Sequence, residues 1–232
     1  MNGKLYLIPS EMGEQSPERL FPAFNLGILG SIKYFVVENA RTSRRFLKKV
    51  CPTVNIEETE FYEINKHSPA DSIAEMMRPL FAGNDMGVIS EAGMPCIADP
   101  GNLIVAEAHK KNIQVVPLVG PNSIIMALIA SGFNGQNFAF HGYVPIKDDR
   151  KKMLTSWESM ALRTGQTQIF METPYRNMQL FADLLATLRP STRLCLATDI
   201  TLPTESIKTL TVAEWKKQQP NLQKRPTIFL IL

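Results

Sequence analysis

Short apolar runs alternate with longer segments of helical periodicity along the first half of the chain. Strand-like runs lie at 5–9, 33–38, 86–90 and 113–118. Segments with helical periodicity, or with helix start and stop signals, separate them at 16–29, 42–50, 67–83 and 102–112. Strands and helices in this rhythm are joined by right-handed crossovers, which place the strands parallel to one another. The pattern therefore predicts an α/β domain with a mainly parallel sheet over residues 1–118.

The rhythm changes beyond residue 118, where strands follow one another with fewer helices between them. Helices are predicted at 121–132, 150–162 and 174–188, and strands at 137–145, 166–172, 193–199, 206–212 and 226–232. On the last of these helices one stripe is predicted to face the core, made of Met178, Phe181, Leu184, Leu185 and Leu188. Few crossover helices favour a mixed sheet, so we expect a second small α/β domain at 119–232 and a cleft between the two domains.

The net charge of the 232-residue chain is +3, which does not by itself indicate a nucleic-acid-binding protein. Basic side chains nevertheless gather in two segments, 41–49 and 147–152. The first segment contains Arg41, Arg44, Arg45 and Lys48. A solvated helix face explains such a run, and so does a surface that contacts RNA phosphates. The sequence leaves both interpretations open.

The three cysteines and three histidines stand apart, without a CxxC pair or the spacing of metal ligands. We therefore expect a reducing compartment, no disulfide and no bound metal. The opening residues, MNGKLYLIPS, are unlike a signal peptide. The most apolar stretch, 115–133, is interrupted by Pro117, Gly120 and Pro121 and so is not a membrane span. These features predict a cytoplasmic protein.

Four predicted strand ends carry residues that suit a ligand-binding loop better than a core. They are VISEAGMPCIADPG at 88–101, VVPLVGPNS at 115–123, FMETPYR at 170–176 and LATDIT at 196–201. In parallel sheets ligands bind beyond the carboxyl ends of the strands, and Gly93 permits a positive φ there. A tight turn capped by Asp99 and a linker at Gly120 are the structural alternatives. The sequence lacks the motifs of phosphate loops, serine hydrolases and zinc peptidases, which argues against those three classes of enzyme.

Six segments resemble, in order and spacing, motifs of the tetrapyrrole (corrin/porphyrin) methylase superfamily. Their residues are most similar to the motifs of its ribosomal RNA small-subunit methyltransferase I branch. The segments are LYLIPSEMG, VVENARTSRRFL, VISEAGMPCIADPG, VVPLVGPNSIIMALIASG, FAFHGYVP and IFMETPYR. The resemblance covers nearly the whole chain. It implies a homodimer of two-domain subunits that bind S-adenosylmethionine (SAM) between the domains. It also implies methylation of the 2′-oxygen of a cytidine ribose in 16S ribosomal RNA.

The resemblance further implies which residues hold the cofactor. They are Ser90, Glu91, Ala92, Gly93, Met94, Pro95, Gly120, Pro121, Ser123, Phe170, Met171, Thr173, Ala197 and Thr198. The residues expected to contact RNA phosphates are Arg41, Arg44, Arg45 and Lys48. A ribose hydroxyl is a weak nucleophile that gains from a nearby base, and Glu38 and Glu14 are the candidates. Each of them has an alternative interpretation as a surface or salt-bridged glutamate.

Three segments depart from the pattern of that branch. The branch has P-T-P-I-G-N-L where this sequence has PSEMGEQ, and Asp where it has Glu91. It has E-D-T-R where this sequence has Glu38, Asn39, Ala40 and Arg41. Two other functions therefore remain open. One is small-molecule methylation of the tetrapyrrole type, and the other is SAM binding without methyl transfer.

Overall fold

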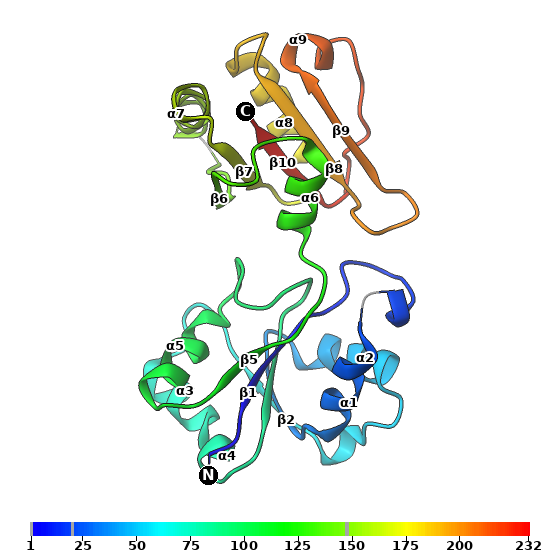
Figure 1. Ribbon diagram of the computed structural model, residues 1–232, viewed down its shortest axis with the longest axis vertical. Helices are drawn as coiled ribbons and strands as arrows, with labels where there is room; N and C mark the ends of the chain where they lie inside the picture. The colour runs from blue at the N-terminus through cyan, green and yellow to red at the C-terminus, as the bar shows by residue number, and fades with distance from the viewer. Residues whose placement is uncertain (1, 20, 147–148) are drawn as a thin grey trace. The chain divides into compact units, whose positions relative to one another are not determined.

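The computed structural model of the protein describes residues 2–19, 21–146 and 149–232. The chain divides into two compact units, Met1–Asn122 and Ser123–Leu232, each built around its own five-stranded sheet (Figure 1). Within the described ranges, no helix has the length and apolar character needed to cross a membrane.

All strands of the first sheet are parallel, and their order is β3-β2-β4-β1-β5. The strands are β1 (Leu5–Ile8), β2 (Tyr34–Val37), β3 (Glu60–Glu63), β4 (Met86–Ile89) and β5 (Val115–Pro117). The predicted parallel sheet is thus confirmed, with one strand that the sequence analysis missed. That strand, β3, lies at the sheet edge, and the charged residues of its sequence EFYE hide the apolar signal of a buried strand.

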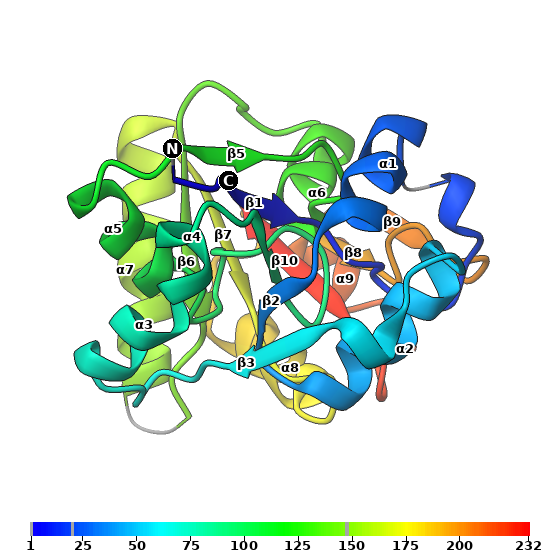
Figure 2. The same cartoon turned by 90° about the horizontal axis from the view of Figure 1, so that it is seen from below.

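Helices cover both faces of this sheet, so its central strand β4 is buried on both sides. The helices are α1 (Ala23–Ser31), α2 (Ala40–Val50), α3 (Ala70–Met76), α4 (Arg78–Phe81) and α5 (Asn102–Lys110). Helices α1 and α2 lie on one face and α3, α4 and α5 on the other (Figure 2). Successive residues of β2 show the alternation: Phe35 and Val37 pack toward α1 and α2, whereas Val36 packs toward α3–α5.

Prolines divide two segments that the sequence analysis predicted as single helices. In the segment 16–29, a 3-10 turn at Pro17–Arg19 precedes Pro22, whose ψ of 146° is extended, and α1 begins only after it. In the segment 67–83, α3 ends at Met76 and Pro79 lies in the first turn of α4. Proline lacks an N–H and clashes with the preceding turn, so each helix restarts at the proline instead of running through it.

The second sheet has the order β6-β7-β10-β8-β9 and is mixed, as predicted. Strands β6 and β7 pair in parallel, and the remaining pairs are antiparallel. The strands are β6 (Phe138–Tyr143), β7 (Thr167–Met171), β8 (Arg193–Thr198), β9 (Ser206–Thr211) and β10 (Thr227–Ile231). The helices are α6 (Ser123–Ser131), α7 (Asp149–Thr164), α8 (Asn177–Thr187) and α9 (Val212–Trp215).

Opposite faces of the second sheet pack against different helices (Figure 1). Helices α7, α8 and α9 cover one face, where Trp157, Phe170 and Phe229 stack in sequence with ring centroids 5.1 and 6.0 Å apart. Helix α6 lies against β8, β9 and β10, and the Thr209 hydroxyl of β9 donates a hydrogen bond to the carbonyl of Ser131. Helices therefore pack against both faces of this sheet.

Two details differ from the sequence predictions. In α8 the buried residues are Asn177, Leu180, Phe181 and Leu184, and Leu188 just after the helix is buried too, whereas Met178 is 39% exposed. The predicted stripe was wrong at Met178 because this residue lies at the edge of the buried face, about a quarter of a turn from Asn177. Residues 119–122, predicted for the second domain, pack with the first unit, where the Asn25 amide donates to the Val119 carbonyl at 2.6 Å.

Candidate functional site

The loop that follows β4 is tied to the loop that follows β1. The Gly93 carbonyl accepts hydrogen bonds from the Ser10 backbone N–H at 2.8 Å and from the buried Ser90 hydroxyl at 3.3 Å. Gly93 has a φ of +72°, the left-handed conformation that glycine adopts without strain. The chain leaves β1 toward the face covered by α1 and leaves β4 toward the face covered by α5. The two loops therefore flank the position in a parallel sheet where ligands bind.

The same loop continues through a strained turn before α5. Cys96 and Ala98 have φ values of +69° and +62°, which are costly for residues other than glycine. The Asp99 carboxylate accepts the Gly101 backbone N–H through Oδ1 at 2.7 Å and so closes the turn. Burial and the Asp99 charge raise the pKa of the Cys96 thiol to about 12, so this cysteine stays protonated and is a poor nucleophile.

A cavity of about 370 Å³, the β1–β4 pocket, opens at the ends of β1 and β4 beside α2. Four residues that the sequence analysis selected line it together: Glu14, Arg45, Ser90 and Glu91. Its other lining residues are Ser10, Glu11, Thr42, Ser43, Phe46, Lys49 and Ile89. Lys49 and Glu11 form a salt bridge at 2.6 Å across the pocket wall. The pocket therefore carries charges of both signs and several hydroxyls.

A second cavity of about 520 Å³, the β2–β4 pocket, lies on the other side of the β4 loop. It is lined by Glu38, Ile64, Asn65, Lys66, Ala98, Asp99, Pro100, Asn102 and Leu103. Oε1 of Glu38 accepts the Glu91 backbone N–H at 3.2 Å, and Oε1 of Glu91 accepts the Thr42 hydroxyl at 2.5 Å. The two candidate bases, Glu38 and Glu14, consequently line different pockets.

Glu38 is held in a setting that disfavours its charge. Burial raises the pKa of this carboxyl, and the negative charges of Asp99 and Glu91 raise it further, against the opposing hydrogen bond from the Glu91 N–H. A carboxylate with a raised pKa is better matched to accepting a proton near neutral pH. The geometry therefore gives Glu38 a property that suits a general base.

The basic residues of α2 form an exposed face next to the β1–β4 pocket. Arg41, Arg44, Arg45 and Lys48 are all exposed. The Arg44 guanidinium lies over the Phe61 ring, 5.0 Å from its centroid. These side chains extend from a helix whose other face, including Phe46 and Leu47, is buried in the core.

Asn39 begins α2 at the position where the related branch has aspartate. Its side-chain oxygen accepts the backbone N–H groups of Arg41 and Thr42 at 2.9 and 3.2 Å. Asparagine and aspartate are about equally good helix N-caps because both present this acceptor. The departure from the branch therefore leaves the start of α2 intact.

Gly120 and Pro121 stand at the end of the first unit, and Ser123 is the first residue of α6 in the second. A Cβ placed on Gly120 would lie 2.2 Å from Cγ of Pro9, so this glycine allows the 119–122 segment to approach the loop after β1. Pro121 is buried. This close approach is local to the first unit.

In the second unit, the residues predicted from the sequence to contact the cofactor do not all point their side chains toward one site. Neighbouring residues of a strand point to opposite faces, so Phe170 and Met171 cannot both offer side chains to one ligand, nor can Ala197 and Thr198. Phe170 is fully buried between Trp157 and Phe229, so only its backbone is available for a ligand. The Thr198 hydroxyl, also buried, pairs with that of Thr227 at 3.2 Å.

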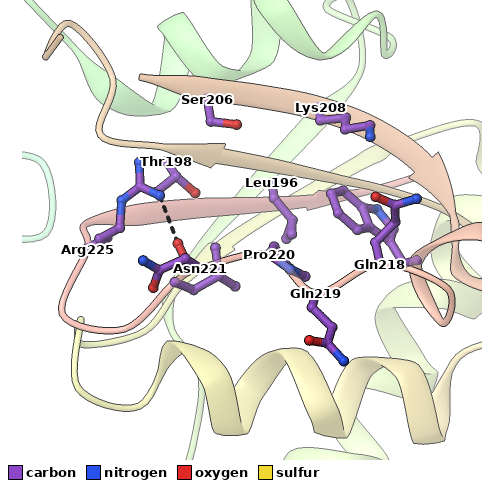
Figure 3. A pocket seen from close by; sticks show the side chains of 11 residues that line it. Leu196, Thr198, Ser206, Lys208, Gln218, Gln219, Pro220, Asn221 and Arg225 are labelled. Carbon is purple, nitrogen blue, oxygen red and sulfur yellow. Dashed lines mark hydrogen bonds between the residues drawn. The ribbon is translucent and has the colours of Figure 1, made fainter. Parts of the chain in front are cut away.

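Thr198 also lies at the base of a cavity of about 180 Å³ in the second unit (Figure 3). Its wall contains Lys208, whose ammonium lies 5.9 Å from the Trp215 ring centroid. Arg225 donates to the carbonyl of Asn221 at 2.8 Å, the bond marked in Figure 3, and pairs with Asp199 at 2.7 Å. Of these residues, Asp199 lies in the segment 196–201 that the sequence analysis selected, whereas Lys208 of β9, Trp215 of α9 and Asn221 and Arg225 before β10 were not selected.

A buried ion network at the end of β7 also escaped the sequence analysis. The fully buried Glu172 carboxylate accepts hydrogen bonds from the guanidinium groups of Arg150 at 2.8 Å and Arg176 at 2.7 Å. Arg150 also forms a salt bridge with Asp183 at 2.8 Å. Burial by itself would raise the pKa of Glu172, but hydrogen bonds from Arg176 and the Thr173 N–H, with the two arginine charges, lower it overall. The FMETPYR motif thus contains a paired glutamate whose lowered pKa keeps it ionised at neutral pH.

Residues 26–216 of the chain match the family of Tetrapyrrole (Corrin/Porphyrin) Methylases. The chain belongs to this family. It is a methyltransferase, because the family that it matches and the curated relatives that it resembles are methyltransferases, and a solved methyltransferase shares its fold. The resemblance stated from the sequence is therefore confirmed.

Several curated relatives of this methylase carry the name Ribosomal RNA small subunit methyltransferase I. The Vibrio cholerae protein is 29% identical over 231 residues, which cover 98% of this chain and 76% of the relative. The Escherichia coli O157:H7 protein is 26% identical and covers 99% and 77%. A Streptococcus pyogenes protein is 32% identical over 185 residues, which cover 80% and 61%.

Solved structures of other methyltransferases share the fold. The methyltransferase CobJ has a TM-score of 0.64 at 15% identity and covers 99% of this chain and 93% of its own. Cobalt precorrin-4 methyltransferase CbiF has a TM-score of 0.60 at 15% identity and covers 98% and 94%. At this level of identity the likeness confirms the predicted α/β class of this methylase and leaves its substrate open.

Proposed function

We propose that this methylase transfers a methyl group from SAM to the 2′-oxygen of a cytidine ribose in 16S ribosomal RNA. The observation that carries this function is the similarity, over nearly the entire chain, to proteins named Ribosomal RNA small subunit methyltransferase I. The exposed basic face of α2 supports an RNA substrate. A ribosomal substrate in turn places the protein in the cytoplasm.

The β1–β4 pocket fits the amino-acid portion of SAM, which carries an ammonium, a carboxylate and a sulfonium. Glu91 and Glu14 would hold the positive groups, and Arg45 would hold the carboxylate. Gly93 and the loop residues 90–95 would supply backbone contacts. In the second unit, Ser123, Met171, Thr173, Ala197 or Thr198 and the Phe170 backbone remain the cofactor contacts that the resemblance implies.

SAM, when bound, supplies an activated methyl group, so the protein's task is to place and deprotonate the acceptor. Glu38 would accept the proton of the ribose hydroxyl as the new C–O bond forms. Its raised pKa suits this role, and its hydrogen bond from the Glu91 N–H keeps the carboxylate in place. Glu14 is the second candidate, from the neighbouring pocket.

Three exposed side chains of α2, Arg41, Arg44 and Lys48, would contact phosphates of the RNA. Arg45, predicted with them as an RNA contact, lines the β1–β4 pocket and would instead hold the SAM carboxylate. Such contacts release counterions, so RNA affinity should fall steeply as salt rises. Alanine at Arg41 or Arg44 should reduce both the affinity for small subunits and the slope of its salt dependence. Lys110→Ala on α5 is the matched control, because Lys110 is an exposed cation on another helix.

The decisive experiment maps 2′-O-methylation of 16S RNA in cells with and without the gene. It is paired with calorimetry of SAM binding to the purified protein. Loss of one cytidine 2′-O-methyl group supports the proposal, and its return requires Glu38. An unchanged 16S RNA together with tight SAM binding contradicts it, and labelled SAM with corrin or porphyrin acceptors then tests the small-molecule alternative. Light scattering tests the homodimer that the resemblance implies.

A further inference from the structure

The β2–β4 pocket contains a buried acceptor atom that the preceding description leaves unused. Among the described residues, Oδ2 of Asp99 has no hydrogen-bond partner, although it is shielded from solvent. Oδ1 of the same carboxylate is occupied by the Gly101 N–H. A buried polar atom without a partner is costly, and a native protein retains it where a ligand supplies the missing group.

The backbone around Asp99 fixes this atom in place. Cys96 and Ala98, three residues and one residue before it, both occupy the left-handed region, and the Gly101 N–H anchors the carboxylate from the other side. A Cβ on Gly101 would lie 2.9 Å from Oδ1 of Asp99, so this approach also needs glycine. Strain of this kind persists where the surrounding structure holds a functional group in one orientation.

Three further side chains of the pocket carry hydrogen-bond donors, which the Asp99 carboxylate lacks. Asn65, Lys66 and Asn102 line the same cavity. The side-chain oxygen of Asn65 is committed to the His67 N–H at 2.9 Å, which leaves its amide N–H groups as the part that a ligand can use. Glu38, the candidate base, lies in the same wall. The pocket thus combines one buried acceptor, several donors and a base.

We propose that the β2–β4 pocket is the binding site for the base of the methylated nucleotide and that Asp99 selects cytosine by accepting its exocyclic amino group. Cytosine presents an N4 amino donor beside the N3 and O2 acceptors, which matches an acceptor flanked by Asn65, Lys66 and Asn102. Uracil carries a carbonyl at C4, which would face a carboxylate and leave both oxygens unpaired. A nucleotide turned out of its helix is read in this manner, by hydrogen bonds to its Watson–Crick edge.

This role rests on the proposed function, since it presumes that the acceptor is a nucleotide. Its placement agrees with that function, because Glu38 would then meet the ribose of the nucleotide whose base lies against Asp99. Asp99 is here a specificity-determining residue that touches the substrate base and takes no part in proton transfer.

Two measurements test this assignment, and the first does not depend on methyl transfer. Binding of cytidine and uridine monophosphates to the full chain is measured by NMR or calorimetry with saturating S-adenosylhomocysteine. We expect the cytidine nucleotide to bind at least about tenfold more tightly, in line with one well-placed base contact. Equal binding, or no detectable binding of the cytidine nucleotide, overturns the assignment.

The second measurement uses Asp99→Asn, which keeps an oxygen for the Gly101 N–H and replaces the free oxygen with a donor. The preference for cytidine over uridine should fall by about tenfold or reverse, while SAM affinity stays unchanged. Asp85→Asn is the matched control, because Asp85 precedes β4 at the other end of the strand and accepts the Lys4 N–H. The preference of Asp85→Asn for cytidine over uridine should equal that of the wild type.

The outcomes separate this assignment from the proposed function. If the wild-type enzyme methylates small subunits and Asp99→Asn keeps the same cytidine preference, the role of Asp99 is wrong and the function stands. If the wild-type enzyme leaves 16S RNA unmethylated but still prefers the cytidine nucleotide, the pocket is a cytosine site and the ribosomal target is wrong.

Discussion

Two glutamates follow strands in this protein, and they meet opposite environments. Glu38 follows β2 and lies near the carboxylates of Asp99 and Glu91. Glu172 follows β7 and forms salt bridges with Arg150 and Arg176. Burial disfavours charge on both, yet the pKa of Glu38 is raised and that of Glu172 is lowered. At Glu38 burial is the largest cause of the raised pKa, whereas at Glu172 hydrogen bonds and arginine charges together outweigh burial.

The contrast separates a carboxylate that stabilises the fold from one that is available for chemistry. A buried glutamate that accepts hydrogen bonds from two arginines and a backbone N–H keeps its charge at neutral pH. A half-buried glutamate beside other carboxylates is held at a cost, which a protein retains where the group acts on a ligand. We therefore interpret Glu172 as a residue that stabilises the second unit, and the environment of Glu38 is consistent with its proposed role as a general base.

The largest effect should come from Glu172→Gln. This change leaves Arg150, whose side chain is 9% exposed, without its buried partner, and breaking such a pair costs about 3–5 kcal/mol of unfolding free energy. Urea unfolding monitored by tryptophan fluorescence, which reports Trp157 and Trp215 of this unit, measures the loss. Glu75→Gln is the control, because its pair with Arg78 is exposed and should contribute about 0–0.5 kcal/mol.

The pH dependence of the same transition carries a definite sign. The folded-state pKa of Glu172 lies below its unfolded value, so its contribution is present above the unfolded pKa and disappears as pH falls through the folded one. The wild-type protein should therefore lose more stability than Glu172→Gln on acidification below about pH 4.5. Parallel pH profiles for the two proteins would contradict the structural assignment.

Gly120→Ala should have the next largest effect. The added methyl group would lie 2.2 Å from Cγ and 2.4 Å from Cβ of Pro9, so the loop must move, at a cost of about 1–3 kcal/mol. SAM affinity should fall as well, since the loops after β1 and β4 share this contact region. Gly27→Ala is the matched control: a Cβ there meets nothing within 4 Å, and alanine in α1 should stabilise by about 0.5–1 kcal/mol.

The parallel sheet could be predicted from the sequence because buried strands and crossover helices each leave a periodic signal. The edge strand Glu60–Glu63 could not, since charged residues at both of its ends replace that signal. The break at Pro79 could have been predicted, because proline inside a helical segment is itself a sequence feature. Alternation along β7 likewise shows that Phe170 and Met171 face opposite sides.

The candidate site was predictable only in part. The loop after β4 carries a glycine and proline signature, which indicates Gly93 and Glu91, whereas Glu38 is a candidate only because the proposed chemistry calls for a base. Asp99 was noted as a helix cap, but its second oxygen becomes informative only once its burial is known. The partners of Glu172 lie 22 residues before it and 4 residues after it, and only the tertiary structure brings the distant one, Arg150, to it.

Asn39→Ala should have a moderate effect that bears on the departure from the related branch. Removing the side-chain oxygen leaves the N–H groups of Arg41 and Thr42 without their cap, at a cost of about 1 kcal/mol. Asn39→Asp should keep the stability of the wild type, because the carboxylate offers the same acceptor. Thermal unfolding of both variants measures the difference. A stable alanine variant would show that the cap contributes little to α2.

Glu38→Gln should have the smallest effect on stability. The sign of the stability change at pH 7 distinguishes Glu38 from Glu172. The folded-state pKa of Glu38 is raised, so ionisation costs stability at neutral pH, and the cost vanishes as pH falls below the unfolded pKa of about 4.3. Glutamine keeps an oxygen for the Glu91 N–H and removes the charge. At pH 7 the variant should therefore be as stable as the wild type or more stable, while methyl transfer is lost. A clear loss of stability at pH 7 would place Glu38 with Glu172, as a residue that stabilises the fold.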